Sequence, residues 1–480
     1  MKILYVASEA LPFASTGGLA DVMGSLPAAV KRASGGTADV RVVIPMYRRI
    51  KERAVRNAEF RLVSEGTVSL AWRQQYCGIW ETERDGVTYY FIDNEYYFSR
   101  NMMYGDYDDG ERFAYFGRAV IHLMSVLGFI PDIMHANDWQ SAPAVIYLKR
   151  CLGASPEWRD VRVLFTIHNI EYQGKYDPAI LGDVFGLSEA DRSTVEYGGC
   201  INLLKGAIVC ADMVSTVSER YADELLTEYY SCGLHYILRE RRDHLCGIVN
   251  GIDTAYYDPE TDPDIVRNYS AKSCAGKAEN KAELRRICGI TAAADRAPLM
   301  IMVSRLATHK GFELVERVLY DLLRETDLTF AVLGTGEARY EDFFRRAAAD
   351  HPGRVGVHLT YDKTLSKLFY AGGDMFLMPS KSEPCGLSQM IASRYGAVPI
   401  VRETGGLVDT IRPYNEFTGE GNGFSFTNYN AHDMMTVIKY ALNLYGQKQK
   451  WNALRRRAMN TDFSWRASAE KYLALYGRML

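Results

Sequence analysis

An arginine and a lysine stand five residues apart in the segment Ser304–Gly311. The apolar run Leu299–Val303 directly precedes them, so we expect Arg305 and Lys310 to flank a turn between a strand and a helix. Two cations beside a helix N-terminus can bind a diphosphate, because the helix dipole and free N–H groups also attract anions. A solvated charge pair is the alternative, but the position after a buried strand favours the phosphate site.

A second polar segment, Pro379–Gln389, contains Glu383 where a strand region ends and we expect a helix to begin. The backbone N–H groups of Cys385, Gly386 and Leu387 would then be donors at a helix start. The thiol of Cys385 has no histidine beside it in sequence, which argues against a cysteine nucleophile.

Two Gly-Gly turns follow predicted strands, one in each half of the chain. Paired glycines let a backbone approach a ligand closely, and a helix that starts there attracts anions. The first turn taken alone is better explained as an ordinary strand-to-helix connection. The residues concerned are Ser15, Thr16, Gly17, Gly18 and Asp21 in the first turn, and Thr404, Gly405 and Gly406 in the second.

Polar residues also end two further predicted strands in the first half. Asp138 and Trp139 follow one strand, and His168 follows the next. A carboxylate can accept hydrogen bonds from sugar hydroxyls, and the indole of Trp139 can pack against a sugar face. A lone histidine is more often structural, but polar clusters at three successive strand ends favour a binding or catalytic site.

The composition indicates a soluble enzyme of two domains. A chain of 480 residues exceeds the size of one ordinary core. A formal net charge of −3 offers no global basic field for a nucleic acid or an anionic membrane, so neither is expected as a partner. Nine cysteines occur without a C-x-x-C pair, which argues against zinc and suits a reducing compartment. With no signal peptide and no membrane-spanning run, we expect a cytoplasmic protein.

Apolar runs alternate with helix-like segments along the whole chain, which predicts an α/β fold of two doubly wound, Rossmann-like domains with parallel sheets. Proline and acidic residues cluster at Asp258–Pro263, where we expect a linker. The expected strands are Ile3–Ala7, Val40–Ile44, Tyr89–Ile92, Ile133–His135, Val161–Ile167, Met213–Val217, Leu299–Val303, Phe330–Leu333, Val355–Leu359, Met375–Met378 and Pro399–Val401, and the helices include Asp21–Ala33, Gly110–Leu127, Gly311–Thr326, Arg339–Asp350 and Leu365–Ala371.

Six motifs in this order and spacing resemble the glycogen and starch synthases of glycosyltransferase family 5. They are T-G-G-L-A-D-V, H-x-x-D-W, T-x-H-N, R-L-x-x-x-K-G, E-P-C-G-L and T-G-G-L, and the resemblance runs from Ile3 to the C-terminal helix. It implies the GT-B architecture, in which two Rossmann-like domains face a central cleft. Residues 1–255 would form the acceptor-side domain, with helix 465–480 returning to it, and residues 256–464 the nucleotide-sugar-binding domain.

The resemblance also implies a role for each matching residue. Arg305 and Lys310 would hold the ADP diphosphate, Glu383 would lie beside the transferred glucose, His168 would contact it, and Asp138 would lie where donor and acceptor meet. The family commonly has lysine where this chain has Ser15, which supplies no charge. The implied substrate-binding residues are Ser15, Thr16, Gly17, Gly18, Asp21, Asn250, Tyr361 (near the adenine), Cys385, Gly386, Leu387, Thr404, Gly405 and Gly406.

The resemblance implies that the chain would transfer glucose from ADP-glucose to the non-reducing end of an α-1,4-glucan, with retention of configuration, release of ADP, and no cofactor or metal. A nicotinamide dehydrogenase would need G-x-G-x-x-G after the first strand, and the chain has Thr16-Gly17-Gly18 there. No second carboxylate stands at a glycosidase-like position. A synthase that prefers UDP-glucose and an inactive glucan-binding or regulatory paralogue stay open as alternatives.

Overall fold

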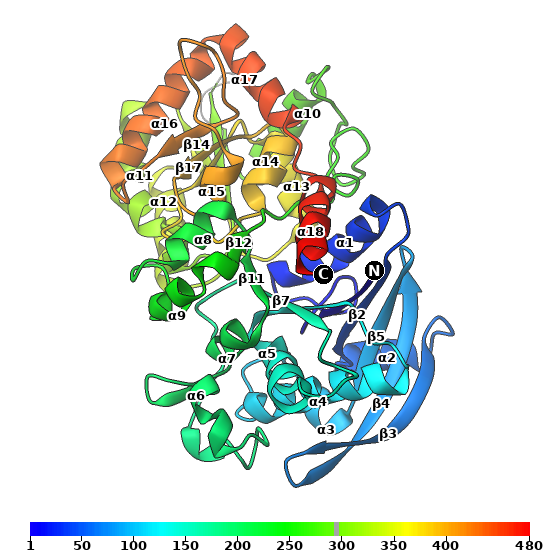
Figure 1. Cartoon of the computed structure of the whole chain (residues 1–480). Helices are drawn as coiled ribbons and strands as arrows, with labels where there is room; N and C mark the ends of the chain where they lie inside the picture. The colour runs from blue at the N-terminus through cyan, green and yellow to red at the C-terminus, as the bar shows by residue number, and fades with distance from the viewer. Residues whose placement is uncertain (292–296) are drawn as a thin grey trace. The chain divides into compact units, whose positions relative to one another are not determined.

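The computed structural model describes residues 1–291 and 297–480, which form two compact α/β units (Figure 1). Unit 1 comprises Met1–Gly251 together with Trp465–Leu480, and unit 2 comprises Ile252–Ser464. Each unit has its own main sheet and its own hydrophobic core. Among the residues described, no helix has the length and apolarity needed to cross a membrane.

Unit 1 is built on a nine-stranded sheet in the order β12-β11-β7-β6-β1-β2-β5-β4-β3. The strands from β12 to β5 pair in parallel, whereas β4 pairs antiparallel with both β5 and β3. The bounds are β1 (Lys2–Val6), β2 (Asp39–Pro45), β3 (Arg61–Leu70), β4 (Arg73–Arg84), β5 (Val87–Asp93), β6 (Ile133–Asn137), β7 (Arg162–Ile167), β11 (Met213–Thr216) and β12 (Leu245–Gly247). A small separate sheet joins β8 (Lys175–Tyr176), β10 (Cys200–Asn202) and β9 (Glu196–Tyr197).

The β3–β4 hairpin corrects the expectation of a wholly parallel sheet. Near the turn, over residues 65–70 and 73–76, more buried and more exposed side chains alternate. Such alternation lacks the continuous apolar run of a parallel strand. The helices of unit 1 are α1 (Gly18–Ala33), α2 (Arg48–Ala54), α3 (Glu95–Phe98), α4 (Asp109–Val126), α5 (Asp138–Ile146), α6 (Arg192–Val195), α7 (Leu203–Cys210), α8 (Glu219–Leu225), α9 (His235–Glu240) and α18 (Trp465–Met479).

The last helix, α18, belongs to unit 1 and is held there by buried hydroxyl groups. Tyr476 lies with its hydroxyl 2.9 Å from that of Tyr5 on β1 and 2.8 Å from Nδ1 of His135 on β6. The hydroxyl of Ser468 donates to the carbonyl of Val249 at 2.6 Å. Since buried tyrosines require hydrogen-bond partners, these contacts fix the register of α18 on the sheet.

Unit 2 has a fully parallel sheet in the order β15-β14-β13-β16-β17-β18. Its central strand β13 is almost continuously buried, as expected for a sheet covered on both faces. The strands are β13 (Leu299–Val303), β14 (Thr329–Leu333), β15 (Val355–His358), β16 (Met375–Met378), β17 (Val398–Arg402) and β18 (Phe424–Phe426); the helices are α10 (Gly276–Ile287), α11 (Phe312–Glu325), α12 (Ala338–Asp350), α13 (Lys363–Gly372), α14 (Ser388–Arg394), α15 (Gly406–Thr410), α16 (Ala431–Gly446) and α17 (Lys448–Asn460).

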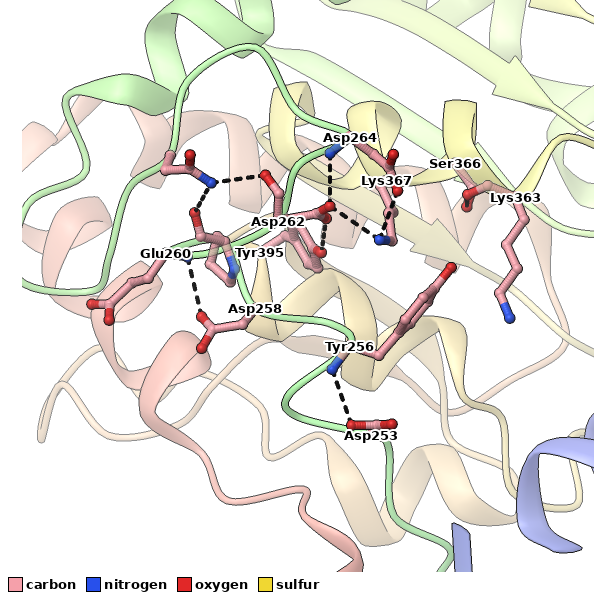
Figure 2. Close-up of polar contacts among 12 residues, drawn as sticks. Asp253, Tyr256, Asp258, Glu260, Asp262, Asp264, Lys363, Ser366, Lys367 and Tyr395 are labelled. Atoms are coloured by element: carbon pink, nitrogen blue, oxygen red, sulfur yellow. Dashed lines mark hydrogen bonds and ion pairs between the residues drawn. The ribbon is translucent and has the colours of Figure 1, made fainter. Parts of the chain in front are cut away.

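The acidic, proline-bearing segment that the sequence suggested as a linker is a packed part of unit 2 (Figure 2). The ammonium of Lys367 on α13 lies 3.0 Å from Asp262 and 2.9 Å from Asp264. The hydroxyl of Tyr395 donates to the other oxygen of Asp262. Both Lys367 and Asp262 are buried. The segment is therefore fixed to α13, because moving it away would break a buried ion pair.

Replacing Lys367 by methionine should therefore destabilise unit 2 strongly. Methionine fills the space of the side chain but leaves the buried Asp262 carboxylate without its cation, a change that typically costs about 3–5 kcal/mol. We expect a lower urea midpoint for the unit 2 transition, followed by circular dichroism. Arg345→Met is the matched control, because Arg345 pairs with Glu341 and Asp342 on the surface of α12 and such pairs contribute little. Equal midpoints for the two variants would contradict the anchoring role.

Candidate functional site

In unit 1, Asp138 and His168 lie side by side at the carboxyl edge of the sheet. Asp138 directly follows β6 and His168 directly follows β7, and these strands are parallel neighbours. The Asp138 carboxylate accepts the backbone N–H of His168 at 2.7 Å and that of Asn169 at 3.4 Å. These bonds lock the carboxylate of one strand end onto the backbone of the next.

The backbone and the carboxyl group of Asp138 are both held in unfavourable states. Its φ is +56°, a left-handed conformation that costs a non-glycine residue roughly 1–2 kcal/mol. Burial raises the pKa of the carboxyl group to about 7, and the hydrogen bonds from His168 and Asn169 offset only part of that rise. Strain and a displaced pKa at one residue are typical of a functional site.

The His168 imidazole is held as a neutral hydrogen-bonding group. Burial lowers its pKa to about 3. Its Nε2 lies 2.9 Å from Oδ1 of Asn137, whose amide nitrogen donates to the carbonyls of Val6 and His135. Since the amide orientation makes Oδ1 the acceptor, Nε2 carries the hydrogen, and His168 contributes a dipole rather than a charge.

Glu9 is a site residue that the sequence motifs did not single out. Its Oε2 accepts the backbone N–H of Thr16 at 2.5 Å and the Thr16 hydroxyl at 3.0 Å, and so fixes the Gly-Gly turn before α1. Burial raises the pKa of the Glu9 carboxyl group to about 7, and the nearby Asp21 adds to the rise. The available signal was the position of Glu9 shortly after the first strand, which ends at Val6; Asp138 and His168 follow their strands directly.

The remaining residues expected in unit 1 divide into exposed and buried groups. Ser15, Thr16, Gly17 and Gly18 are exposed at the start of α1, where a ligand can reach the helix N-terminus. Asn250 is buried, and among the residues described none hydrogen-bonds its Oδ1. The suggestion that Trp139 packs against a sugar is wrong. Its ring is only 8% exposed and packs edge-on against Phe113 in the core.

In unit 2, an ion pair joins two of the predicted motifs. The Lys310 ammonium lies 2.6 Å from Oε2 of Glu383, which also accepts the Ser380 hydroxyl at 3.0 Å. Lys310 follows β13 and Glu383 follows β16, and these strands are parallel neighbours. Glu383 is only 6% exposed, so the cation and carboxylate form one partly desolvated unit.

The loops that carry this ion pair pack closely against each other. The backbone N–H of Lys381 donates to the carbonyl of His309 at 2.8 Å. Gly311 has a φ of +77°, and a Cβ there would lie 2.1 Å from the carbonyl oxygen of Pro379. The glycine that ends R-L-x-x-x-K-G is therefore required by contact with the E-P-C-G-L loop.

Arg305 is exposed and lies in the same connection between β13 and α11 as Lys310. Leu306, its neighbour, is fully buried and anchors the loop. Within residues 1–291 and 297–480, the Arg305 side chain has no carboxylate or carbonyl partner, so its donors remain available to an anion. Lys310 therefore supplies a cation already paired with a carboxylate, and Arg305 supplies one that is not.

The second Gly-Gly turn packs against the Glu383 loop. The N–H of Gly406 donates to the carbonyl of Glu383 at 3.1 Å, and a Cβ on Gly405 would lie 2.0 Å from that oxygen. Thr404 precedes them and is buried. The turn therefore holds the backbone of Glu383 at close range, and only glycine fits at Gly405.

One expectation about the E-P-C-G-L segment is wrong. The helix begins at Ser388 rather than at Glu383, because Gly386 adopts a φ of +70° and interrupts the helical path. Cys385, Gly386 and Leu387 therefore form a loop before α14. In the described part of the chain, the N–H groups of Gly386 and Leu387 have no backbone or side-chain acceptor, so they remain donors for a ligand.

Tyr361, expected near the adenine, is an exposed side chain of unit 2. It is 83% exposed and lies in the connection between β15 and α13. Among the residues described, no hydrogen bond, ion pair or ring contact joins Tyr361 to Arg305, Lys310 or Glu383. Over the same residues, no three His, Cys, Asp or Glu side chains converge as ligands for a metal ion.

Comparison with known proteins relates the whole chain to glucan-synthesising enzymes. Residues 2–240 match the starch synthase catalytic domain, and residues 287–458 match the glycosyl transferases group 1. The chain is 46% identical to a glycogen synthase of Geobacillus thermodenitrificans, covering 100% of this chain and 98% of the relative. It is 45% identical to a glycogen synthase of Clostridium novyi, covering 100% and 99%.

Solved structures show the same relationship. The catalytic domain of starch synthase IV from Arabidopsis thaliana, bound to ADP and acarbose, matches with a TM-score of 0.90 and 33% identity over 99% of both chains. A sucrose-phosphate synthase from Thermosynechococcus elongatus matches with a TM-score of 0.62 at 15% identity, covering 100% of this chain and 98% of that one, and shares only the fold. The α/β architecture expected from the sequence, of the GT-B type, is thereby confirmed.

The raised pKa of Asp138 makes a prediction about stability and pH. In the unfolded chain this carboxyl group ionises near pH 4, whereas in the folded chain it ionises near pH 7. Between pH 4 and pH 7 this carboxyl group is ionised in the unfolded chain but protonated in the folded chain, so the unfolding free energy falls as the pH rises. Above pH 7 the group is ionised in both states, and the unfolding free energy falls no further on its account. Asp138→Asn should therefore stabilise the protein by about 2–4 kcal/mol at pH 8 relative to pH 4, measured as the difference in unfolding free energy from the native chain.

Asparagine also tolerates a positive φ better than aspartate, but this gain does not depend on pH. Asp138→Gly also relieves the backbone strain, but it removes the oxygen that accepts the backbone N–H of His168. Comparison of the two variants therefore separates the effect of the strain from the effect of this hydrogen bond. If the stability difference between the native chain and Asp138→Asn is constant from pH 4 to pH 8, the carboxylate is not destabilised by burial.

Proposed function

The chain belongs to the glycogen synthase family, and from this premise we propose that it transfers glucose from ADP-glucose to the non-reducing end of an α-1,4-glucan, with retention of configuration and release of ADP. The relatives are similar over the whole chain. The solved relative bound to ADP and acarbose supports a nucleotide donor and an oligosaccharide acceptor. We place the activity in the cytoplasm.

The observation that carries the proposal is the charge arrangement at the carboxyl edge of the unit 2 sheet. Arg305 offers a guanidinium that has no carboxylate or carbonyl partner within residues 1–291 and 297–480, and Lys310 offers an ammonium paired with Glu383. We assign both cations to the diphosphate of the donor, where charge grows as the bond to glucose breaks. Preorganised donors at a developing anion are among the largest contributions to catalysis. These groups supply positive charge without a metal ion, and the proposal needs none.

The reaction itself is a substitution at the anomeric carbon. The bond from C1 to the diphosphate oxygen breaks with its electron pair, and a hydroxyl oxygen of the acceptor forms the new bond to C1 on the same face. The hydroxyl proton passes to the departing phosphate. We place Glu383 beside the transferred glucose, where its carboxylate stabilises the oxocarbenium-like centre, and the N–H groups of Gly386 and Leu387 on the sugar hydroxyls.

In unit 1 we assign binding roles to the cluster at the strand ends. His168, being neutral, orients a sugar hydroxyl by hydrogen bonding rather than by charge. Asp138 accepts from a hydroxyl where donor and acceptor meet, with its carboxylate aimed by the backbone of His168. Glu9 does not contact substrate in this assignment. It is a positioning residue that fixes the glycine-rich turn through Thr16.

A donor panel tests the proposal. Purified protein is incubated with glycogen and either ADP-glucose or UDP-glucose, and the released nucleoside diphosphate and the labelled glucan are both measured. We expect transfer with ADP-glucose as the better donor. Higher kcat/KM with UDP-glucose would reassign the donor. Absence of transfer from every donor, with glycogen binding retained, would favour the glucan-binding paralogue.

Arg305 and Lys310 should respond differently to truncation. Both variants should lose about 10²–10³ in kcat with saturating ADP-glucose, because each removes one donor to the leaving diphosphate. Only Lys310→Ala should also lower the unfolding midpoint, since it leaves the buried Glu383 carboxylate unpaired. Arg305 has no carboxylate or carbonyl partner among the residues that the structure describes.

The control is Arg345→Ala, which removes an exposed cation of the same unit from α12. It should leave both kcat and the unfolding midpoint unchanged. Near-normal kcat in both Arg305→Ala and Lys310→Ala would contradict the diphosphate assignment. A stability loss in Arg305→Ala equal to that in Lys310→Ala would contradict the difference in pairing.

Ser15 offers a test in the opposite direction. Serine lies exposed before the Gly-Gly turn and can donate one hydrogen bond but no charge. Ser15→Lys should lower the Kd for ADP-glucose, with a larger gain at low salt because the attraction between charges is screened. Ser15→Met, similar in length but uncharged, should give no gain. Unchanged or weaker donor binding in Ser15→Lys would mean that the turn does not approach the phosphates.

A further inference from the structure

A fully buried glutamine, Gln389, lies in the first turn of α14, directly after the loop of Cys385, Gly386 and Leu387. Its Nε2 donates to the carbonyl oxygen of Cys385 at 3.1 Å and to that of Gly386 at 2.9 Å. Carbonyl oxygens only accept hydrogen bonds, so the nitrogen of the amide must face the loop. Among the residues described, no group donates to Oε1 of Gln389, and the side chain therefore acts on this loop as a donor.

These two hydrogen bonds determine which way the N–H groups of the loop point. The peptide bonds after Cys385 and Gly386 are trans. In a trans peptide the carbonyl group and the N–H of the next residue point in opposite directions. Because both carbonyls face the Gln389 amide, the N–H groups of Gly386 and Leu387 point away from it. They are the two donors for which the described part of the chain offers no acceptor.

The same amide connects this loop to the second Gly-Gly turn. Nε2 of Gln389 lies 3.1 Å from the hydroxyl oxygen of Thr410 on α15, a neighbouring helix of unit 2 (Figure 1). That hydroxyl donates to the carbonyl of Gly406 at 2.6 Å, so it accepts from Gln389. One side chain on a helix therefore links the loop before α14 to the turn at the start of α15.

Gly386 is packed closely against the amide. Its φ is +70°, which glycine adopts without strain, and a Cβ there would lie 2.5 Å from Oε1 of Gln389. A larger residue at position 386 would therefore displace the amide. The glycine allows Gln389 to reach the backbone of the loop, and Gln389 in turn holds that backbone.

A buried glutamine can also serve stability alone, but the bonds of Gln389 favour a more specific role. Its Oε1 is buried without a partner among the residues described, and such an atom costs stability. Within the same residues, the side-chain amide of Gln389 donates only to Cys385, Gly386 and Thr410. All three belong to the loops to which we assign donor binding, or to the helix that follows one of them.

We propose that Gln389 is a positioning residue for glucose transfer. It aims the N–H groups of Gly386 and Leu387 at the hydroxyl groups of the transferred glucose, and so determines how well the enzyme distinguishes ADP-glucose from ADP. The hydrogen bonds to the two carbonyls also polarise these peptide groups, which strengthens their N–H groups as donors. The inference rests on the proposed function, which assigns these N–H groups to the sugar.

Gln389→Met tests this role, because methionine has a similar length and no N–H group. The Kd values of ADP-glucose and of ADP are measured by titration calorimetry without glucan, on protein with a native circular dichroism spectrum. The Kd of ADP-glucose should rise about tenfold, since two hydrogen bonds to the sugar lose their alignment. The Kd of ADP should stay at the native value, because ADP carries no glucose. An equal loss of affinity for both ligands, or for neither, would overturn the proposal.

Gln389→Glu separates the donated hydrogen from the shape of the side chain. A carboxyl group has the same shape as the amide but donates a hydrogen bond only when it is protonated. Burial raises the pKa of such a group, so the variant should approach the native kcat/KM as the pH falls from about 8 to about 6. This comparison remains decisive if Gln389→Met does not fold. Activity as low as that of Gln389→Met at every pH would overturn the role of the donated hydrogen.

Ser393 provides the matched control on the same helix. It is buried, and its hydroxyl donates to the backbone carbonyl of Gln389 at 2.9 Å. Ser393→Ala removes a buried hydrogen bond of α14 without altering the side-chain amide of Gln389. The ratio of the two Kd values should stay native. The same change of ratio as in Gln389→Met would overturn the proposal, because any disturbance of α14 would then suffice.

Failure of the proposed function gives a different result from failure of this inference. A native chain that transfers glucose from no nucleotide sugar overturns the proposed function, whatever the Gln389 variants do. A native chain that transfers glucose, together with a Gln389→Met variant that distinguishes ADP-glucose from ADP as well as the native chain does, overturns only the positioning role.

Discussion

The arrangement of unit 2 depends on the ion pair between Lys310 and Glu383. The pair joins the loops after two neighbouring parallel strands, and the partly desolvated carboxylate cannot lose its cation without a large cost. A Gly-Gly turn from the next strand closes on the Glu383 backbone through Gly406. The ion pair and this hydrogen bond therefore hold together three loops to which we assign donor binding. Among the residues described, Arg305 has no carboxylate or carbonyl partner.

Unit 1 uses a different constraint, the desolvation of carboxyl groups at strand ends. Glu9 and Asp138 both have a pKa raised to about 7. Each carboxylate accepts a hydrogen bond from a backbone N–H group of another loop. The neutral imidazole of His168 completes this cluster. The backbone of Asp138 is strained, because its φ is positive. A strained residue does not add to stability, so we assign Asp138 to function.

The two units also differ in how their peripheral elements are fixed. Hydroxyl groups of α18 reach the core of unit 1 through Tyr5 and His135, whereas a buried ion pair between Lys367 and Asp262 ties the entry segment of unit 2 to α13 (Figure 2). On the outer surface of unit 1, the β3–β4 hairpin keeps Trp72 oriented through Asp183. Each of these contacts joins residues more than a hundred positions apart in sequence, so each depends on the completed fold.

The sequence by itself determined the architecture and the motifs. Continuous apolar runs define the parallel strands of both sheets, because strands buried on both faces carry no polar alternation, and the motifs follow those strands at the edge where ligands bind. The local sequence pattern gave wrong predictions where only one face of a strand is buried, or where a residue with a positive φ interrupts a helix. The hairpin β3–β4 alternates, the helix after Glu383 is delayed by the positive φ of Gly386, and Trp139 belongs to the core. Only the tertiary structure decided the pairing of Lys310 with Glu383, the displaced pKa values of Glu9 and Asp138, and the exposure of Trp72. Desolvation and long-range contacts set these properties, and neither is encoded in the spacing of residues along the chain.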